Sequence, residues 1–526
     1  MARRGAPGRA GLAALSGLVL AAAFPRLDAS PLVFMSLVPL LAAAHGASPR
    51  AAAVLGMVAG VLFFGILLEW IRIFDSTGWV LLVALHAAYI AAFAWLLARL
   101  RPRAGGWPSL LLAASAWTAL EWLRSVGPCA LTWGGLAYAL HRFPPLVQLA
   151  SVTGPFGLSF LVALANAAIA EVVLDRAGRK GAAALASVRR LTLVAALLGG
   201  AWAWGAWRLG QPFPEGRTAR VALVQASLGE EGVRRVLTPE ALDEALRTYL
   251  DLTETAAAGR PDIVIWPESS VPVALREKGA SAIRDALQQM AARLRADLVM
   301  GAGYRDTAGN PRNSAYLFTP DGQLAGRYDK VHLVPFGEYT PFRRQLGFLY
   351  RHFPIITRDF APGQGFYPLP AETAPLGVAI CFESSFPGIA RTLRREGARL
   401  LVVITNDAWF GVRSATWQHY RMAAFRAVEN GCYLARAAAT GFSAILDPCG
   451  REIARTDLMA RAVIQGDVRL SPAATPYLAL GDWVVLGSIL FLGASVLARR
   501  RPLSERGAAA RRVGSRGGGA AARGER

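Results

Sequence analysis

Eight long apolar segments constrain this 526-residue chain more than any other feature. Each approaches the roughly 20 residues that an α-helix needs to cross the hydrocarbon layer of a membrane. The second and the last are short, so they would be tilted or would extend into their flanks. The sequence therefore predicts a membrane α-helical bundle of about eight transmembrane helices, at residues 10–25, 30–46, 51–73, 78–98, 107–124, 150–174, 191–208 and 483–498. The stretch 125–149, which contains Pro128, two adjacent glycines and two adjacent prolines, is predicted to be a loop or a re-entrant segment.

Basic residues predict the orientation of these helices. The chain carries a formal net charge of +21, and its arginines and lysines gather before the first segment, after the fourth, between the sixth and seventh, and after the eighth. With eight crossings, all four clusters fall on one side, which the positive-inside rule identifies as the cytoplasm. Both termini are then cytoplasmic, and the charge is explained without a nucleic-acid partner. The tail 500–526 is predicted to be a disordered basic flank, although contact with anionic lipid or RNA is a second interpretation.

The predicted helices and their orientation divide the chain into four parts. Residues 1–209 would form a transmembrane domain of about seven helices, residues 210–480 an aqueous domain, residues 481–499 the last transmembrane helix and residues 500–526 the tail. The aqueous domain would lie on the periplasmic side of a bacterial inner membrane. Residues 1–24 also fit a cleaved signal peptide, because basic residues and an apolar core precede three adjacent alanines. Either interpretation leaves the later helices in the same orientation.

The aqueous domain alternates between two hydrophobic patterns. Short runs rich in Val, Ile and Leu, such as 220–225, 262–266 and 399–405, are separated by helical stretches such as 238–258 and 416–430. Strands this apolar are covered by helices on at least one face, which predicts an α/β layered architecture. The four cysteines show no CxxC spacing and the six histidines show no HExxH pattern, so neither a metal nor another cofactor is predicted.

Three predicted strand ends carry reactive side chains. Cys381 lies between an apolar run and a helical run, where the N-terminus of a helix favours a thiolate. Glu268 ends a second apolar run, and Lys330 lies in a long segment of mixed polarity. A thiol that attacks a carbonyl, a carboxylate that takes and returns a proton and an ammonium that stabilises the oxyanion together form an acyl-transfer site. Taken singly, the three residues also fit a packed core cysteine, a solvated strand end and a salt-bridge partner of Asp329.

Four motifs around these residues resemble those of the apolipoprotein N-acyltransferases, a membrane branch of the nitrilase superfamily. They are WPES at 266–269, DKVHLVPFGEYTP at 329–341, CFES at 381–384 and TNDAWFG at 405–411. The resemblance covers essentially the whole chain, and the VPFGEYTP motif is more specific than the Glu, Lys and Cys motifs alone. It implies a nitrilase-like αββα sandwich in which Cys381 is the nucleophile, Glu268 the general base and Lys330 the oxyanion-stabilising residue.

The resemblance also implies supporting residues. Glu338 would polarise Lys330 or the base, Glu383 would hold the turn, and the backbone N–H of Phe382 would be a second oxyanion donor. The alternative for both carboxylates is that they only anchor loops through hydrogen bonds. Apolar loop residues would form lids that dip into the membrane interface, or would simply pack the loops. These residues are Phe336, Tyr339, Phe342, Phe348, Leu349, Tyr350, Phe353, Trp409 and Phe410.

The implied reaction moves a fatty acyl chain in two steps. The cysteine takes the chain from a membrane phospholipid, with phosphatidylethanolamine the expected donor, and the N-terminal diacylglyceryl-cysteine amine of an apolipoprotein then receives it from the thioester. The protein is expected to be a monomer.

The turn after the first strand departs from the family pattern, because it lacks a Gln-Gly-Asn-like sequence and has no tryptophan between Gln225 and Trp266. Two other functions stay open from the residues alone. One is a membrane-tethered nitrilase-type amidase that acts on a small C–N substrate, and the other is a transporter or lipid-binding scaffold.

Overall fold

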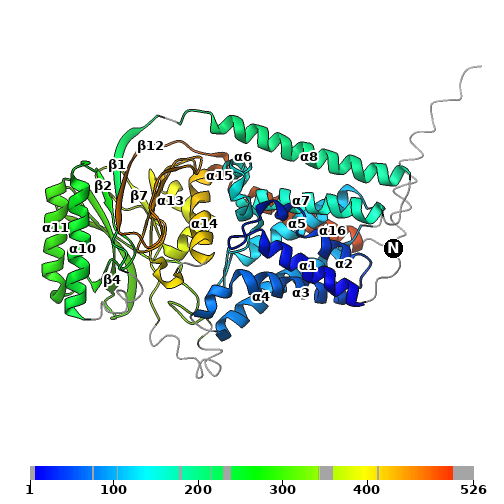
Figure 1. The fold of residues 1–526 in the computed structure, drawn as a ribbon, viewed down its shortest axis with the longest axis horizontal. Coiled ribbons are helices and arrows are strands. Elements are labelled where there is room, and N and C mark those ends of the chain that lie inside the picture. Colours follow the sequence, from blue (N-terminus) through cyan, green and yellow to red (C-terminus); the bar gives the residue numbers. More distant parts are fainter. Residues whose placement is uncertain are drawn as a thin grey trace, which may run out of the picture.

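The computed structural model describes residues 6–500, except residues 74–75, 103–104, 177–180, 214, 229–237, 342, 344–358 and 412–413. Within these residues the chain forms a bundle of helices and, at one end of the bundle, a domain with two β-sheets (Figure 1). Helix α8 (Ala182–Leu209) runs along one side of the bundle and leads into the first strand, β1 (Arg217–Gln225).

The bundle is built from the apolar segments. Four of its described helices are long and apolar enough to cross a membrane: α3 (Pro49–Leu67), α4 (Ser76–Leu100), α7 (Ala150–Arg176) and α8. Three apolar stretches are shorter, namely α1 (Ala6–Ala22), Ser30–Ala44, which ends in α2 (Val38–Ala44), and α16 (Trp483–Arg500). Helix α5 (Trp107–Arg124) includes Glu121 and Arg124 among its apolar residues. The prediction of eight membrane-spanning helices is therefore confirmed in part: four described helices are long and apolar enough to span, and the other four segments form shorter or more polar helices.

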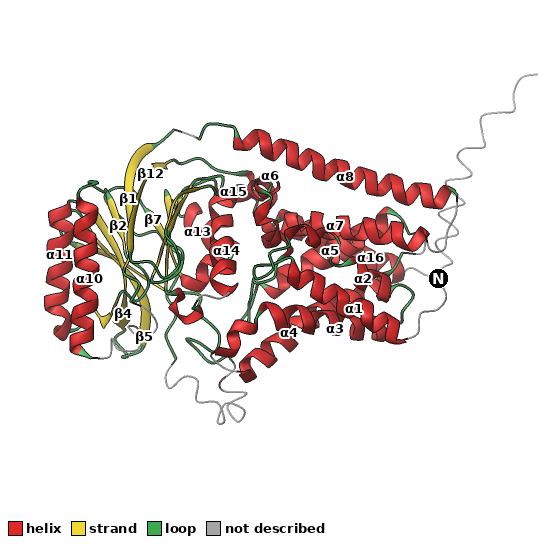
Figure 2. Cartoon of the chain, viewed as in Figure 1, coloured by secondary structure: helices red, strands yellow, loops and turns green. Residues whose placement is uncertain are grey.

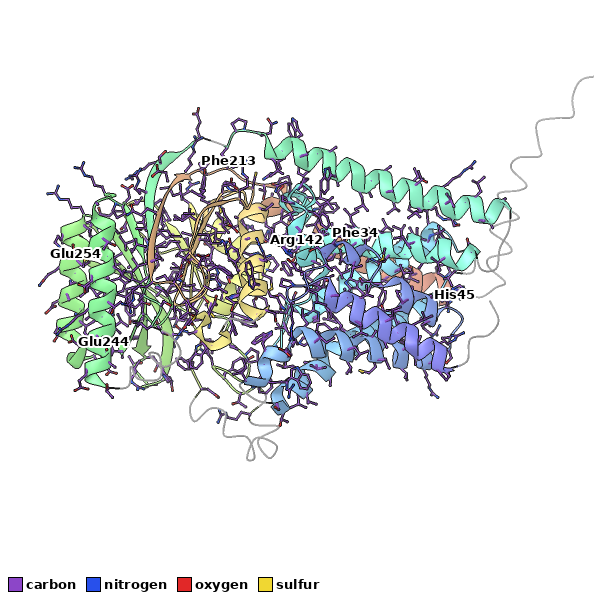
Figure 3. The ribbon with its side chains drawn as sticks, in the orientation of Figure 1. Phe34, His45, Arg142, Phe213, Glu244 and Glu254 are labelled. Carbon is purple, nitrogen blue, oxygen red and sulfur yellow. The ribbon has the colours of Figure 1, made fainter. Side chains whose placement is uncertain are left out.

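The segment 125–149 forms no long helix and folds over the end of the bundle that faces the sheets. It contains the 3₁₀-helix η3 (Leu136–Arg142) and the short helix α6 (Pro144–Val147). Two buried charges of α5 satisfy its backbone: Arg124 donates to the carbonyls of Leu131 and Trp133, and Glu121 accepts from the N–H of Leu136. Figure 3 places Arg142 at this end of the bundle and His45 at the opposite end.

Two mixed sheets form the centre of the second domain. The first has the strand order β12-β1-β2-β4-β5-β6 with β3 beside β4, and the second has the order β11-β10-β9-β8-β7. The strands of the first sheet are β1, β2 (Ile263–Ile265), β3 (Val271–Ala274), β4 (Asp297–Arg305), β5 (Pro311–Phe318), β6 (Leu324–Asp329) and β12 (Ala462–Leu470). Those of the second are β7 (Leu376–Ile380), β8 (Leu400–Thr405), β9 (Leu434–Ala438), β10 (Ala444–Leu446) and β11 (Glu452–Arg455).

Helices cover the outer faces of both sheets, so the domain has four layers. Helices α10 (Pro239–Ala257) and α11 (Ser281–Leu294) lie on the first sheet, and α13 (Pro387–Arg395) and α14 (Ser414–Asn430) lie on the second (Figures 1 and 2). The second helical layer faces the bundle (Figure 1). This αββα order confirms the predicted layered architecture.

The alternation of side chains along β1 shows why helices and a sheet cover its two faces. Val221 and Leu223 belong to the core between the sheets, whereas Ala222 and Val224 belong to the core beneath α10 and α11. Successive residues of a strand point to opposite faces, so a run without polar residues is buried on both sides. The same arrangement brings the carboxyl ends of β7 and β8, which are parallel neighbours, to one edge of the sandwich.

Candidate active site

Cys381 lies in a sharp turn at the carboxyl end of β7. It begins the 3₁₀-helix η5 (Cys381–Ser385), and helix α13 starts at Pro387. Its φ is 52°, in the left-handed region that residues with a Cβ rarely adopt. Such a conformation costs about 1–2 kcal/mol and persists only where surrounding contacts hold it, so it directs attention to function.

Cys381 is partly buried. Burial, followed by the charge of Glu268, raises the pKa of the Cys381 thiol, while the charge of Lys330 opposes the rise. The sequence predicted that the N-terminus of a helix would favour the thiolate; in the fold, burial outweighs that effect. The resting thiol is therefore protonated, and a base must remove its proton before attack.

The structure brings Glu268 and Lys330 to this thiol. Glu268 lies in the turn that follows β2, Lys330 directly follows β6, and both side chains are buried. Lys330 Nζ is 3.7 Å from Glu268 Oε1, and its charge acts on the Cys381 thiol. Burial would lower the pKa of Lys330, but the charges of Glu338 and Glu268 outweigh burial and raise it. A cation, a carboxylate and a thiol thus share one water-poor site.

Glu338 and Asn313 complete a hydrogen-bond network around Glu268. Lys330 Nζ donates to Glu338 Oε1 at 2.9 Å, and Asn313 Nδ2 donates to Glu268 Oε1 at 2.7 Å and to Glu338 Oε1 at 3.1 Å. The N–H of Asn406 donates to the other oxygen of Glu268 at 2.7 Å. Both oxygens of Glu268 therefore have donors that fix their positions. Asn313 was missed from the sequence; its only signal there is a polar residue beside an apolar run.

Glu383 joins the Cys381 turn to the Lys330 loop. Its Oε1 accepts from the N–H groups of Val331 and His332 and from the hydroxyl of Tyr328, and its Oε2 accepts from the N–H of Ile380. Burial raises the pKa of Glu383 to about 7, against the backbone donors, which lower it. These contacts fit both the predicted role of holding the turn and the alternative of anchoring loops, so the role of Glu383 stays a prediction.

The aromatic residues predicted to form lids differ in their surroundings. Phe410 packs edge-on against Trp70 of the bundle, with ring centroids 4.9 Å apart, and Trp409 next to it is 47% exposed. The Phe336 N–H donates to the Tyr339 carbonyl, and the Tyr339 hydroxyl donates to the Pro128 carbonyl in the segment 125–149. Phe342, Phe348, Leu349, Tyr350 and Phe353 lie outside the described residues, as does most of the atypical turn that follows β1 (229–237).

The bundle reaches the site through Trp133. This residue of the segment 125–149 stacks on Phe382, with ring centroids 5.7 Å apart and planes 21° apart. Its side chain is buried. The nucleophile turn is therefore packed directly against the membrane-directed part of the molecule.

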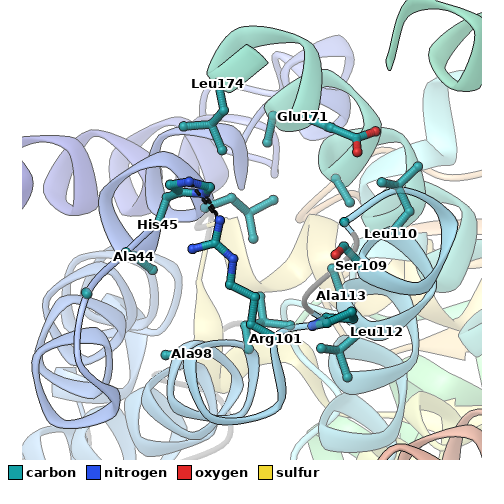
Figure 4. A pocket seen from close by; sticks show the side chains of 18 of the residues that line it. Ala44, His45, Ala98, Arg101, Ser109, Leu110, Leu112, Ala113, Glu171 and Leu174 are labelled. Atoms are coloured by element: carbon teal, nitrogen blue, oxygen red, sulfur yellow. Dashed lines mark hydrogen bonds between the residues drawn. The ribbon is translucent and has the colours of Figure 1, made fainter. Parts of the chain in front are cut away.

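A cavity of about 200 Å³ lies at the opposite end of the bundle (Figure 4). His45, Arg101, Ser109 and Glu171 are among its lining residues, and an Arg101 nitrogen approaches His45 Nε2 at 2.8 Å (Figure 4). None of Glu268, Lys330 and Cys381 lines it. The cavity is therefore separate from the candidate active site.

Two family models match this chain. The carbon-nitrogen hydrolase family matches residues 220–475, and the N-terminal domain of apolipoprotein N-acyltransferase matches residues 16–168. Relatives match along nearly the whole chain: an apolipoprotein N-acyltransferase of Geobacter metallireducens is 37% identical, and one of Gloeobacter violaceus is 32% identical. Each match covers 93% of this chain and 94% of the relative. Among solved structures, Saccharomyces cerevisiae Nit3, a member of branch 10 of the nitrilase superfamily, is 20% identical with a TM-score of 0.39, over 48% of this chain and 91% of that one.

Proposed function

This chain belongs to the apolipoprotein N-acyltransferase family, and from that premise we propose that Cys381, Glu268 and Lys330 carry out its acyl transfer. The protein is an acyltransferase of bacterial membranes. The N-acyltransferase relatives and the matching N-terminal domain favour transfer of an acyl chain from a phospholipid to a lipoprotein. They do not favour the small-substrate amidase that the residues alone left open.

In the first half-reaction Glu268 takes the proton of the Cys381 thiol, and the sulfur attacks the ester carbonyl of the phospholipid. The carbonyl oxygen becomes an oxyanion, which the Lys330 ammonium and the N–H of Phe382 stabilise. The intermediate collapses as the C–O bond breaks, and Glu268 returns the proton to the departing lysophospholipid oxygen. The product is a thioester on Cys381.

In the second half-reaction the α-amine of a diacylglyceryl-cysteine attacks the thioester. The same two donors stabilise the second oxyanion, the C–S bond breaks, and Glu268 carries a proton from the amine to the departing sulfur. An amide and a free thiol result. Burial of the site supports this scheme, because the thioester is protected from hydrolysis between the two steps.

The single observation that carries the proposal is the meeting of two buried charged groups and a partly buried thiol from distant parts of the chain. Lys330 lies 3.7 Å from Glu268, and the charges of both act on the Cys381 thiol. A structural ion pair alone gives no reason for a thiol in a left-handed turn beside it. Glu338 supports Lys330, Glu383 holds the turn, and Phe336, Tyr339, Trp409 and Phe410 line the approach for lipid.

The placement in the membrane follows from the same scheme. Both substrates are anchored in lipid, so the site must lie at the outer leaflet. We therefore place the domain of residues 210–480 in the periplasm and the two termini in the cytoplasm, with residues 1–209 and 481–499 as membrane anchors. Phosphatidylethanolamine is the proposed donor, and a single chain is the proposed working unit.

Intact-protein mass spectrometry tests this proposal. Purified protein incubated with phosphatidylethanolamine should gain the mass of one fatty acyl chain, labile to hydroxylamine. Cys381→Ala should gain none, whereas Cys432→Ala, which changes a buried cysteine outside the triad, should retain the adduct. Phosphatidylglycerol in place of phosphatidylethanolamine tests the head group. Absence of the adduct from folded wild-type protein with lipid present would overturn the triad assignment.

A further inference from the structure

A buried histidine that the triad does not use lies directly behind the nucleophile. His419, on α14, is 1% exposed. Its Nε2 lies 3.1 Å from the carbonyl oxygen of Cys381 and 3.0 Å from Ser384 Oγ. The Ser384 hydroxyl is itself 2.8 Å from the same carbonyl oxygen. Two side chains thus converge on one backbone carbonyl.

The other ring nitrogen of His419 is held by a buried ion pair. Nδ1 lies 3.1 Å from Asp407 Oδ1 and 3.2 Å from an Arg436 nitrogen, and that nitrogen donates to Asp407 Oδ2 at 2.8 Å. Burial would raise the pKa of Asp407, but Arg436 and His419 outweigh burial and lower it. Asp407 is therefore a carboxylate, and its ion pair with Arg436 fixes the ring from behind.

Aromatic contacts fix the plane of the ring. Trp133 stacks on His419 with ring centroids 5.7 Å apart, and Phe410 meets its edge. The ring therefore has neighbours on its face, on its edge and at both nitrogens. A side chain with contacts on so many sides has little freedom to move, so it also restrains the group to which it is hydrogen-bonded.

The contact between His419 and the Cys381 carbonyl requires a proton on Nε2. A carbonyl oxygen only accepts hydrogen bonds, so the 3.1 Å contact is favourable when Nε2 carries the proton. The Ser384 hydroxyl then donates its own proton to the same oxygen. With Nε2 protonated, the Cys381 carbonyl accepts two hydrogen bonds from side chains.

That carbonyl and the N–H of Phe382 belong to one planar trans peptide unit and point in opposite directions. Fixing the carbonyl therefore fixes the direction of the N–H. Donors to the carbonyl also polarise the amide, which strengthens its N–H as a donor. We propose that His419 is a positioning residue that, with Ser384, orients and polarises the Phe382 N–H as an oxyanion donor. The inference rests on the acyl transfer proposed above and adds two residues that position one of its oxyanion donors.

Comparison of two reactions of the same thiol tests the inference. Acylation by phosphatidylethanolamine passes through an oxyanion, whereas alkylation by iodoacetamide does not. In His419→Ala, single-turnover acylation and transfer to a synthetic diacylglyceryl-cysteine peptide should both slow by roughly 10- to 100-fold, less than the 10²- to 10³-fold that follows loss of a whole donor. The alkylation rate of Cys381 should stay within about twofold of wild type, because Glu268 and Lys330 are unchanged.

Three further variants complete the experiment. His419→Gln places an amide donor near the same carbonyl and should recover part of the acylation rate. Ser384→Ala removes the other donor and should slow acylation by a smaller factor than His419→Ala. His141→Gln removes a histidine that pairs with Asp28 and has no contact with His419 or the Cys381 turn among the hydrogen bonds and ion pairs of the described residues, so it should leave both reactions unchanged.

The outcomes separate the two proposals. Wild-type protein that forms no acyl adduct overturns the triad mechanism and the inference with it. If wild type is acylated and folded His419→Ala is acylated at the same rate, the positioning role alone is wrong. It is also wrong if alkylation falls in parallel with acylation, which would assign His419 to activation of the thiol. If His419→Ala does not fold, the inference stands or falls on whether Ser384→Ala slows acylation without slowing alkylation.

Discussion

One glycine of β4 sets the position of the proposed base. A Cβ added at Gly301 would lie 2.6 Å from Glu268 Cα, 2.6 Å from the nitrogen of Ser269 and 2.7 Å from the carbonyl oxygen of Pro267. All three are backbone atoms of the turn that carries Glu268, so no side chain can rotate away. Ordinary contact begins at 3.4 Å, and the turn must therefore move by about 0.8 Å.

This displacement predicts the effect of Gly301→Ala. Misplacing a catalytic group by about 1 Å costs on the order of 10²-fold in rate, and overpacking costs about 1–3 kcal/mol in stability. We expect acylation of Cys381 by phosphatidylethanolamine to slow by roughly 10²-fold in a protein that still folds. The matched control is Gly303→Ala in the same strand and on the same face, where the nearest atom is the carbonyl oxygen of Val273 at 3.2 Å.

Single-turnover acylation, followed by intact-protein mass spectrometry, measures the effect. Thermal unfolding in detergent checks that both variants fold. The reasoning is refuted if the folded Gly301→Ala and Gly303→Ala proteins are acylated at the same rate, because Glu268 would then tolerate the displacement or would not be the base.

Two other predictions concern charge. Lys330→Met keeps the length of the side chain but leaves Glu268 and Glu338 without their cation. The rate of Cys381 acylation should therefore fall by about 10²- to 10³-fold. A loss below tenfold in the single-turnover assay would contradict the role of Lys330. Burial, followed by the charge of Lys330, lowers the pKa of His332 to about 4. Between pH 6.5 and 4, His332 is protonated in the unfolded chain but neutral in the native protein. The free energy of unfolding therefore falls by about 3 kcal/mol as the pH drops through this range. His332→Phe keeps the packing on Phe382 and Phe386 but removes this loss. Its melting temperature should fall by roughly 3–5 °C less than that of wild type between pH 7 and 4. Equal falls would show that His332 does not cause the loss.

Much of the fold follows from local patterns. The α/β layering was predictable because apolar strands and amphipathic helices differ in hydrophobic period over a few residues. The strand β12 was not predicted, since its pairing with β1 joins residues almost 250 positions apart. The eight apolar segments were also visible, but only four of the described helices have the length and hydropathy to cross a membrane. The ends of a helix depend on caps, kinks and polar residues, such as Glu121 and Arg124 in α5. Average hydropathy over a segment does not reveal these features.

The residues of the candidate site were likewise predictable only in part. Cys381, Glu268 and Lys330 were identifiable because each follows a strand and because the motifs around them resemble a known family. Asn313 and His419 were not identifiable. Asn313 matters because it donates to two carboxylates, and His419 because it meets the Cys381 carbonyl. These contacts join residues that are 25 to 45 positions apart in the chain.

The sequence by itself determined the kinds of element, the membrane affinity of the first half and the residues able to carry acyl transfer, because these depend on chemistry within a few neighbouring positions. Only the tertiary structure decided that the Cys381 thiol is partly buried with a raised pKa, that Glu338 and Asn313 lie around Glu268, and that Trp133 packs against Phe382 beside Cys381. Burial and electrostatic coupling are properties of what lies around a group in space, and distance along the chain does not encode them.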